Sequence, residues 1–186
     1  MKIISGEFKG RNIEGYQIIG TRPTMDRVKE SIFAMIQDNI KNSLVLDLFA
    51  GSGNYGIESL SNYAKFVYFN DKNKEAVKVI KKNLETFHIE NKAIVYNFDY
   101  KKCLNVLKNE CKKFDLIFLD PPYSLHVIEE IIIFILENDL LKPKGIIVSE
   151  FQGDKLKDKY LNLKKIKERT YGLKTVYIYK MESIWR

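Results

Sequence analysis

Cysteine and histidine are scarce in this chain of 186 residues, which contains two of each. Cys103 and Cys111 have neither the spacing of a zinc site nor the dense pattern of a disulfide-stapled domain. His88 and His126 are isolated and have no ligand residues near them in the sequence. These absences predict no metal site and favour a protein of a reducing compartment.

Long apolar runs are also missing. The longest, Ile131–Leu136, is far shorter than the roughly 20 residues that a membrane-spanning helix needs. The apolar start of the chain is too short for the core of a signal peptide. We therefore expect a soluble, cytoplasmic protein with no membrane partner. The sequence has no coiled-coil pattern that would indicate an oligomer, so a monomer is the default expectation.

Basic residues are unevenly distributed along the chain. The net charge is +7, from 31 Lys and Arg against 24 Asp and Glu. Residues 151–186 carry ten basic against four acidic side chains, and residues 1–29 carry six against three. Such termini would attract a polyanion such as RNA or DNA. A solvated, lysine-rich surface explains the same numbers, so charge alone leaves both interpretations open.

Short apolar stretches alternate with segments of helical periodicity through the middle of the chain. The stretches typical of buried strands are Leu44–Phe49, Phe66–Asn70, Ala93–Asn97, Phe114–Leu119 and Gly145–Glu150. The helical segments between them are Asn54–Tyr63, Lys74–Phe87, Tyr100–Cys111 and His126–Asn138. This alternation predicts an α/β fold with a parallel sheet and right-handed crossovers.

The two ends of the chain depart from that rhythm. Leu161–Arg169 and Thr175–Met181 flank Tyr171-Gly172 and predict an antiparallel hairpin at one edge of the sheet, which brings the strands to seven. Residues 1–24 predict a small β-hairpin extension, followed by one domain over residues 25–186.

A helix is predicted directly after the extension, in the segment TRPTMDRVKESIFAMI. Thr24 is suited to cap its N-terminus. We expect Arg27, Lys29 and Glu30 on its outer face and the apolar residues that follow on its buried face.

A glycine-rich loop, Gly51-Ser52-Gly53-Asn54-Tyr55-Gly56, follows the first strand of the predicted sheet. Its first glycines allow close approach of a ligand to the backbone, and its last allows a helix to pack against the strand. The G-x-G-x-x-G pattern alone fits S-adenosylmethionine (SAM), a dinucleotide or a plain tight turn. Asp47, at the end of the strand, suits the ammonium of SAM, whereas it would repel a pyrophosphate.

Two further acids follow the second and third strands. Asp71 can accept hydrogen bonds from both ribose hydroxyls, a need that SAM and NAD share, or it can cap the next helix. Asp99 can reach an adenine amine or cap the helix after it. The sequence leaves both alternatives open.

The segment Asp120-Pro121-Pro122-Tyr123 follows the fourth strand and is the most informative one. Proline has no backbone N–H, so the stiff loop offers carbonyls as acceptors, to which Asp120 adds a carboxylate. These acceptors can hold a planar NH2 group by its two hydrogens, while Tyr123 offers a face on which a base can stack. The pattern predicts methyl transfer to an exocyclic amine of a nucleobase, without a metal or a covalent intermediate.

Five segments together resemble the RsmD family of bacterial methyltransferases, over about residues 1–180: KIISGEFKGRNI, TRPTMDRVKESIF, LDLFAGSGNYGIESLS, DLIFLDPPY and RTYGLKTVYIY. The resemblance implies a Rossmann-like class I SAM methyltransferase fold. It also implies that the protein methylates the exocyclic N2 of one guanine in 16S ribosomal RNA, with the RNA or a small-subunit assembly intermediate as partner.

By position, the resemblance assigns SAM contacts to Asp47, Gly51, Ser52, Gly53, Asp71 and Asp99, and the target amine to Asp120, Pro121, Pro122 and Tyr123. Candidates for contact with the RNA backbone are Arg11, Arg22 and Arg27. The second-strand acid is often Glu in the family, so Asp71 has a shorter reach here. A DNA adenine-N6 methyltransferase shares the D-P-P-Y segment and is the alternative function.

Overall fold

The computed structural model describes residues 1–15, 22–122, 127–153 and 155–183 of the chain. Its helices are α1 (Arg22–Ile36), α2 (Asn54–Ser61), α3 (Lys74–Phe87), α4 (Tyr100–Asn109) and α5 (Ile128–Glu137), with short 3-10 turns at Gln37–Asn39 and Glu90–Lys92. Its strands are β1 (Leu44–Asp47), β2 (Phe66–Asn70), β3 (Ala93–Tyr96), β4 (Phe114–Leu119), β5 (Leu141–Phe151), β6 (Lys159–Tyr160), β7 (Leu163–Tyr171) and β8 (Lys174–Met181).

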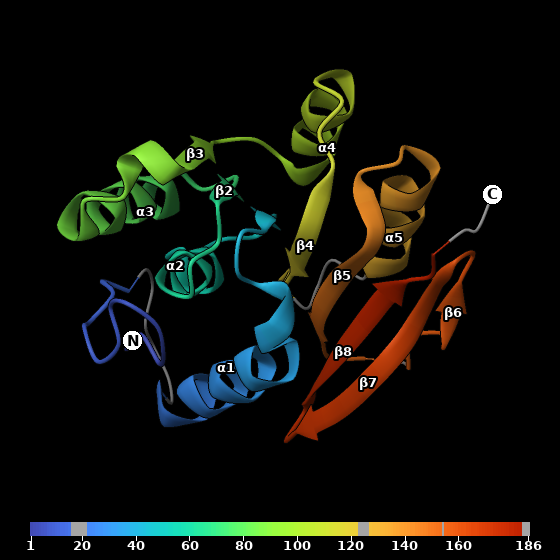
Figure 1. The fold of residues 1–186 in the computed structure, drawn as a ribbon, viewed down its shortest axis with the longest axis horizontal. Coiled ribbons are helices and arrows are strands. Elements are labelled where there is room, and N and C mark those ends of the chain that lie inside the picture. The colour runs from blue at the N-terminus through green and yellow to red at the C-terminus, as the bar shows by residue number, and fades with distance from the viewer. Residues whose placement is uncertain (16–21, 123–126, 154, 184–186) are drawn as a thin grey trace.

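The strands form one sheet in the order β3-β2-β1-β4-β5-β8-β7-β6 (Figure 1). The first five in that order are parallel, and the last three continue the sheet antiparallel. This confirms the predicted parallel α/β fold and its C-terminal hairpin. The described part of the chain has eight strands and not seven, because β6 pairs with the start of β7. Two residues are too few to leave a periodic pattern in the sequence.

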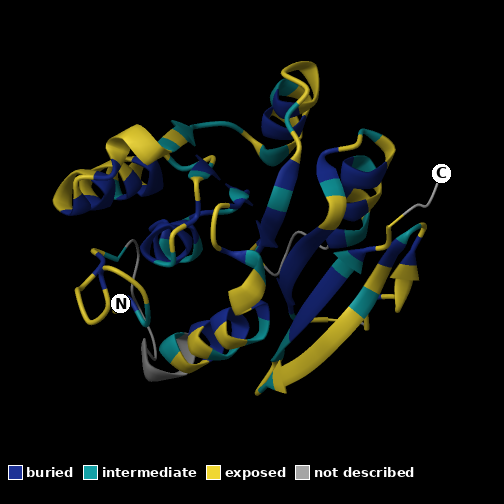
Figure 2. Ribbon diagram, in the orientation of Figure 1, coloured by how far each residue is buried: buried dark blue, intermediate teal, exposed yellow. Residues whose placement is uncertain are grey.

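Helices cover both faces of the sheet. The α1–α3 face packs Ile32, Ile57 and Ile80 against the strands, and the α4–α5 face packs Leu104 and Ile132. Side chains along a strand alternate between these two cores. The central strands are mostly buried, whereas much of β7 is exposed (Figure 2).

The N-terminal segment shares the core of the α1–α3 face. Ile3, Phe8 and Ile13 are buried there, and the backbone N–H of Phe8 donates to the Ser61 hydroxyl at 3.0 Å. Within residues 1–15, the predicted hairpin is reduced to a single antiparallel bridge between Lys2 and Asn12. The domain boundary at residue 24 stays a prediction.

Helix α1 differs from expectation in two respects. It begins at Arg22, so Thr24 lies inside it and is not its cap. Arg27 and Glu30 are exposed as predicted, but the prediction for Lys29 was wrong, because its side chain is fully buried. Its ammonium contacts the Glu58 carboxylate at 2.8 Å, a partner from α2 that α1 alone does not reveal.

In the described part of the chain, no helix is both long and apolar enough to cross a membrane.

Candidate active site

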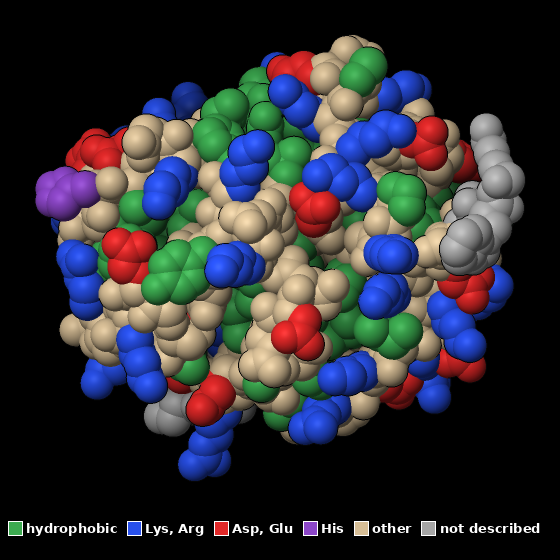
Figure 3. Space-filling model, in the orientation of Figure 1, with side chains coloured by type: hydrophobic (Ala, Val, Ile, Leu, Met, Phe, Trp, Pro, Cys, Tyr) green, Lys and Arg blue, Asp and Glu red, His purple; other side chains and the backbone are tan. Residues whose placement is uncertain are grey.

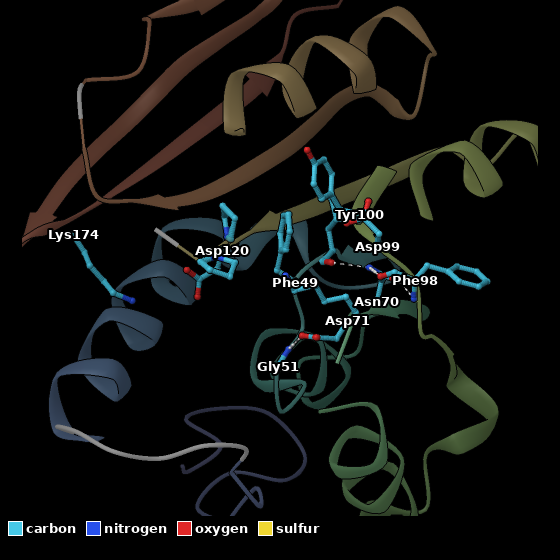
Figure 4. A pocket seen from close by; sticks show the side chains of 13 residues that line it. Phe49, Gly51, Asn70, Asp71, Phe98, Asp99, Tyr100, Asp120 and Lys174 are labelled. Atoms are coloured by element: carbon cyan, nitrogen blue, oxygen red, sulfur yellow. Dashed lines mark hydrogen bonds between the residues drawn. The ribbon is translucent and has the colours of Figure 1, made fainter. Parts of the chain in front are cut away.

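A cleft of about 360 Å³ opens at the carboxyl ends of the parallel strands. Segments at or just after the ends of β1, β2, β3 and β4 line it, together with Lys174 from the start of β8. Its volume is within the range of about 300–1,000 Å³ that is usual for small-molecule sites. In Figure 4, Asp120 and Lys174 lie on one side of the cleft, and Asp71 and Asp99 on the other. The topology therefore brings together the acids that the sequence separates by up to 49 positions.

The glycine-rich loop contributes Gly51 to the wall of this cleft. Gly51 and Gly53 have φ values of 55° and 81°, in the left-handed region that favours glycine. Ser52 and Gly53, the next two residues of the loop, are buried and do not line the cleft. Of the predicted loop contacts, only Gly51 therefore faces the cleft directly.

Asp47 lies beneath the loop and is only 2 % exposed. Its carboxylate accepts a hydrogen bond from the backbone N–H of Gly56, at 3.0 Å, in the first turn of α2. Burial raises the pKa of Asp47 to about 7, against the lowering effect of that bond, and the charges of Asp120 and Asp71 raise it further. The acid that the sequence singled out for a ligand thus fastens the start of α2 to the end of β1.

Gly56 is the point of closest approach between α2 and β2. A Cβ atom built on it would lie 2.1 Å from the ring of Phe69, which is fully buried. We expect Gly56→Ala to destabilise the fold by about 1–3 kcal/mol, because the ring has little room to move. Chemical denaturation measures the change. The penalty should shrink in a Phe69→Leu background, and an equal penalty in both backgrounds would exclude this contact as its cause.

Asp71 joins the glycine-rich loop to the start of α3. One carboxylate oxygen accepts from the Gly51 N–H at 2.9 Å, and the other accepts from the Asn73 N–H at 2.8 Å. The cap of α3 is Asn73, whose side chain accepts from the Glu75 N–H. Asp71 lines the cleft, and each of its oxygens keeps acceptor capacity for a further donor.

Asp99 combines the two alternatives that the sequence left open. It caps α4 by accepting from the Lys101 N–H at 2.9 Å, and it also lines the cleft. The adjacent Phe98 and Tyr100 line the same part of the cleft and add aromatic surface. This corner can take a flat aromatic ring that carries an amine.

Asn70 is a cleft residue that sequence reasoning missed. Its buried amide group donates to the carbonyls of Leu48 and Phe98, at 3.2 and 3.1 Å, and accepts from the Phe98 N–H at 3.2 Å. It therefore ties together the ends of β1, β2 and β3, as the dashed lines in Figure 4 indicate. A polar side chain that ends an apolar strand was the only signal in the sequence.

Asp120 is half-buried at the end of β4, and Pro121 and Pro122 line the cleft beside it. Burial raises the pKa of Asp120, while the nearby Lys174 ammonium opposes the rise. Lys174 also contacts the buried Glu150 carboxylate at 3.3 Å. Lys174 and Glu150 were both missed, because they come from β8 and β5 and no local pattern links them to Asp120. Tyr123 lies outside the described residues.

Two of these acids should make stability depend on pH. Burial raises the pKa of Glu150 to about 7, as it does for Asp47. Between the ordinary carboxyl pKa of about 4 and the folded value of about 7, the folded state binds more protons than the unfolded one, so stability should fall as pH rises from about 4 to about 7. Thermal unfolding across that range measures the fall, and the Asp47→Asn/Glu150→Gln double variant should flatten it. An unchanged slope in the double variant would contradict this assignment.

Two of the arginines predicted for RNA contact, Arg11 and Arg27, do not line the cleft. Arg11 is exposed, but its guanidinium lies 4.3 Å from the centre of the Phe87 ring and donates to the Thr86 carbonyl at 3.0 Å. Arg27 is exposed on α1. The side chain of Arg22 lies outside the described residues.

The family model described as "Conserved hypothetical protein 95" matches residues 1–180, almost the whole chain. The chain belongs to this family. A Haemophilus influenzae relative named "Ribosomal RNA small subunit methyltransferase D" is 37 % identical over 96 % of this chain and 93 % of its own length, which confirms the resemblance to the RsmD family.

Solved structures agree with the fold. One from Escherichia coli is 28 % identical, covers 98 % of both chains and has a TM-score of 0.84. A more distant one, named as the SAM-dependent methyltransferase from Agrobacterium tumefaciens, is 16 % identical, covers 88 % of this chain and 63 % of its own, and has a TM-score of 0.63. At that identity the likeness concerns the fold alone, which is the predicted class I methyltransferase fold.

Proposed function

We propose that the protein transfers a methyl group from SAM to the exocyclic N2 amine of a guanine in 16S ribosomal RNA. The observation that carries the proposal is that one cleft holds both the Asp71–Asp99 side and the Asp120-Pro121 corner. The name of the Haemophilus influenzae relative, at 37 % identity over nearly the whole chain, supports an rRNA substrate. The RNA itself or a small-subunit assembly intermediate is the proposed partner, in the cytoplasm.

The residues present fit SAM. The remaining acceptor capacity of Asp71 suits two ribose hydroxyls, and Asp99 beside Phe98 and Tyr100 suits the adenine. Gly51 offers backbone without a side chain where the amino acid part would lie. Ser52, Gly53 and Asp47 are buried next to this wall and do not line the cleft, so we propose that they hold the loop in shape and do not touch SAM directly. When bound, SAM supplies a methyl group made electrophilic by the adjacent sulfonium.

Asp120 and the carbonyls of the proline corner would orient the target amine. They would accept hydrogen bonds from its two N–H groups, so that the nitrogen lone pair is aimed into the cleft and away from the guanine ring system. The amine becomes acidic as its bond to carbon forms and then sheds one proton. The raised pKa of Asp120 suits it to hold that proton on its carboxylate before water takes it. Tyr123 is proposed to stack on the base, which must leave its helix to enter the cleft.

The backbone of the RNA is proposed to contact Arg11, Arg22 and Arg27. For Arg11, this contact would need the exposed edge of a guanidinium that is already held by Phe87 and Thr86.

Mass-spectrometric mapping of ribosomal RNA from a strain without this protein tests the proposal. We expect the loss of one N2-methylguanosine from 16S RNA and its return on complementation. If the methylation of 16S RNA is unchanged and genomic DNA loses N6-methyladenine, the alternative of a DNA adenine methyltransferase would replace the proposal.

A further inference from the structure

Four cations lie in a row on the α1–α3 face of the C-terminal hairpin. Lys164 pairs with Lys180, Lys167 with Ile178, and Arg169 with Val176. Directly opposite residues share a face of the sheet, and Ile178 and Val176 belong to the core of the α1–α3 face. We call Lys164, Lys167, Arg169 and Lys180 the basic row. The three members on β7 are exposed, and Figure 3 shows Lys and Arg side chains gathered over this hairpin.

On the opposite face of the same hairpin, the lysines have acidic partners. There Lys165 pairs with Asp158 and Glu168, and Lys155 lies 3.6 Å from Glu168. The neighbouring Lys157 also has an acidic partner there, whereas Lys159 lies opposite Lys164 on the α1–α3 face and pairs with Glu182. For the four members of the basic row, by contrast, no carboxylate within the described ranges lies within 4.0 Å. The cations of the opposite face are therefore neutralised by acids of the protein itself. On the α1–α3 face, Lys159 and Lys174 at the two ends of the row pair with Glu182 and Glu150, whereas the four members of the row have no such partner among the described residues.

Two features argue that this asymmetry is not a by-product of a lysine-rich composition. Lys164 and Lys180 lie directly opposite each other, an arrangement of like charges that costs stability. The register also shifts between Lys165 and Lys167, so that Lys167 enters the row while Ile166 is left 45 % exposed in the irregularity. Protection of an edge strand by lysines would explain charge on β7, but not why its cations without acidic partners share one face.

The row leads to the cleft. Tyr171 and Lys174 form the pair that closes the β7–β8 turn, and Lys174 lines the cleft with Asp120. The Tyr171 hydroxyl hydrogen-bonds to Ser31 of α1, which fixes this end of the hairpin. Arg169 and Lys164 lie opposite Val176 and Lys180, so at about 3.4 Å per residue along β8 the row extends about 14 Å. A strand of nucleic acid whose base enters the cleft would pass over it.

We propose that the basic row binds the phosphate backbone of the RNA segment next to the target nucleotide. The inference rests on the proposed function, since it takes RNA as the partner. Phosphates supply the negative charge that the basic row lacks, without reading the base sequence.

The test compares two triple variants that each remove three positive charges. One is Lys164→Gln/Lys167→Gln/Arg169→Gln, and the control is Lys155→Gln/Lys157→Gln/Lys165→Gln, whose lysines already have acidic partners on the opposite face. Binding to protein-free 16S RNA is measured by filter binding at several salt concentrations. Methyl transfer is measured at saturating SAM, and SAM affinity is measured by calorimetry.

For the row variant we expect Kd for RNA to rise at least about tenfold near 0.1 M salt, and the salt slope to fall by about 2, at about 0.7 per phosphate contact on a single strand. KM for RNA should rise, with kcat and SAM affinity unchanged. The control should change Kd by less than about threefold. Equal weakening in both variants, or none in the row variant, would overturn the proposal.

The two levels of inference fail in different ways. If the wild-type protein methylates 16S RNA and the row variant keeps its KM, the row is wrong and the proposed function stands. If the wild-type protein methylates no RNA, the proposed function fails, and the salt dependence of RNA binding still decides on the row.

Discussion

The Asp120→Ala variant is expected to lose methyl transfer by about 10²–10³-fold in kcat while it still binds SAM, if the removal of one aligned group costs what it does in other active sites. Asp120 lies on the opposite side of the cleft from Asp71 and Asp99, so its removal should leave the SAM contacts in place. In the proposed mechanism, the substitution removes the acceptor that would align the amine. Single-turnover transfer to 16S RNA measures the first effect, and calorimetry with SAM measures the second.

Asp99 provides the matched control, since it is an acid in the same cleft on the side assigned to SAM. Asp99→Ala should raise KM for SAM with a smaller effect on kcat, the reverse of the pattern for Asp120. It should also cost some stability, because Asp99 caps α4. A parallel loss of SAM affinity and transfer in Asp120→Ala would instead assign Asp120 to the structure of the loop.

The local parts of this site could be predicted from the sequence. Strands β2 and β4 and helix α3 have the predicted bounds, because each carries a nearly continuous apolar run or stripe. The ends of those strands placed Asp71 and Asp120 at one edge of the sheet, and the structure brings both into one cleft. Parallel topology alone is enough for this, since it gathers the carboxyl ends.

Contacts between distant segments could not be predicted in the same way. Lys174 reaches the cleft only because β8 pairs antiparallel with β5, which brings the start of β8 to the carboxyl end of β5. Asp47 showed a similar limit, because the strand predicted an acid near the loop but not the Gly56 N–H that it accepts from. In both cases the partner lies on another element, and its position depends on the packing of the whole sheet.

The largest error of this kind is the predicted exposure of Lys29, which is in fact buried. Its burial leads to the prediction of a large effect on stability. Its ammonium contacts Glu58 at 2.8 Å and donates to the Lys2 carbonyl and the Asn54 side chain, at 2.6 and 2.8 Å. Glu58 in turn accepts from the backbone N–H groups of Ile4 and Ser5. This network joins the N-terminal segment, α1 and the first residue of α2, directly after the glycine-rich loop.

Lys29→Met should therefore destabilise the protein by about 3–5 kcal/mol, because it leaves the fully buried Glu58 without its counter-charge. Burial lowers the pKa of Lys29 although Glu58 raises it, so the cost of burying this charge exceeds the gain from the ion pair. The intact pair therefore adds little net stability, although breaking it is costly. Unfolding in urea, with SAM absent, measures the loss without a contribution from ligand binding.

Lys82→Met is the matched control, since Lys82 contacts Glu14 at 2.6 Å with side chains that are 64 % and 48 % exposed. Water screens that pair, so its loss should cost about 0–1 kcal/mol. The Lys29→Met/Glu58→Gln double variant should recover part of the stability lost in Lys29→Met, because it no longer buries an uncompensated charge. Equal losses in Lys29→Met and Lys82→Met would mean that burial does not set the cost of breaking this ion pair, and that the N-terminal segment is held to α1 and α2 by its apolar contacts instead.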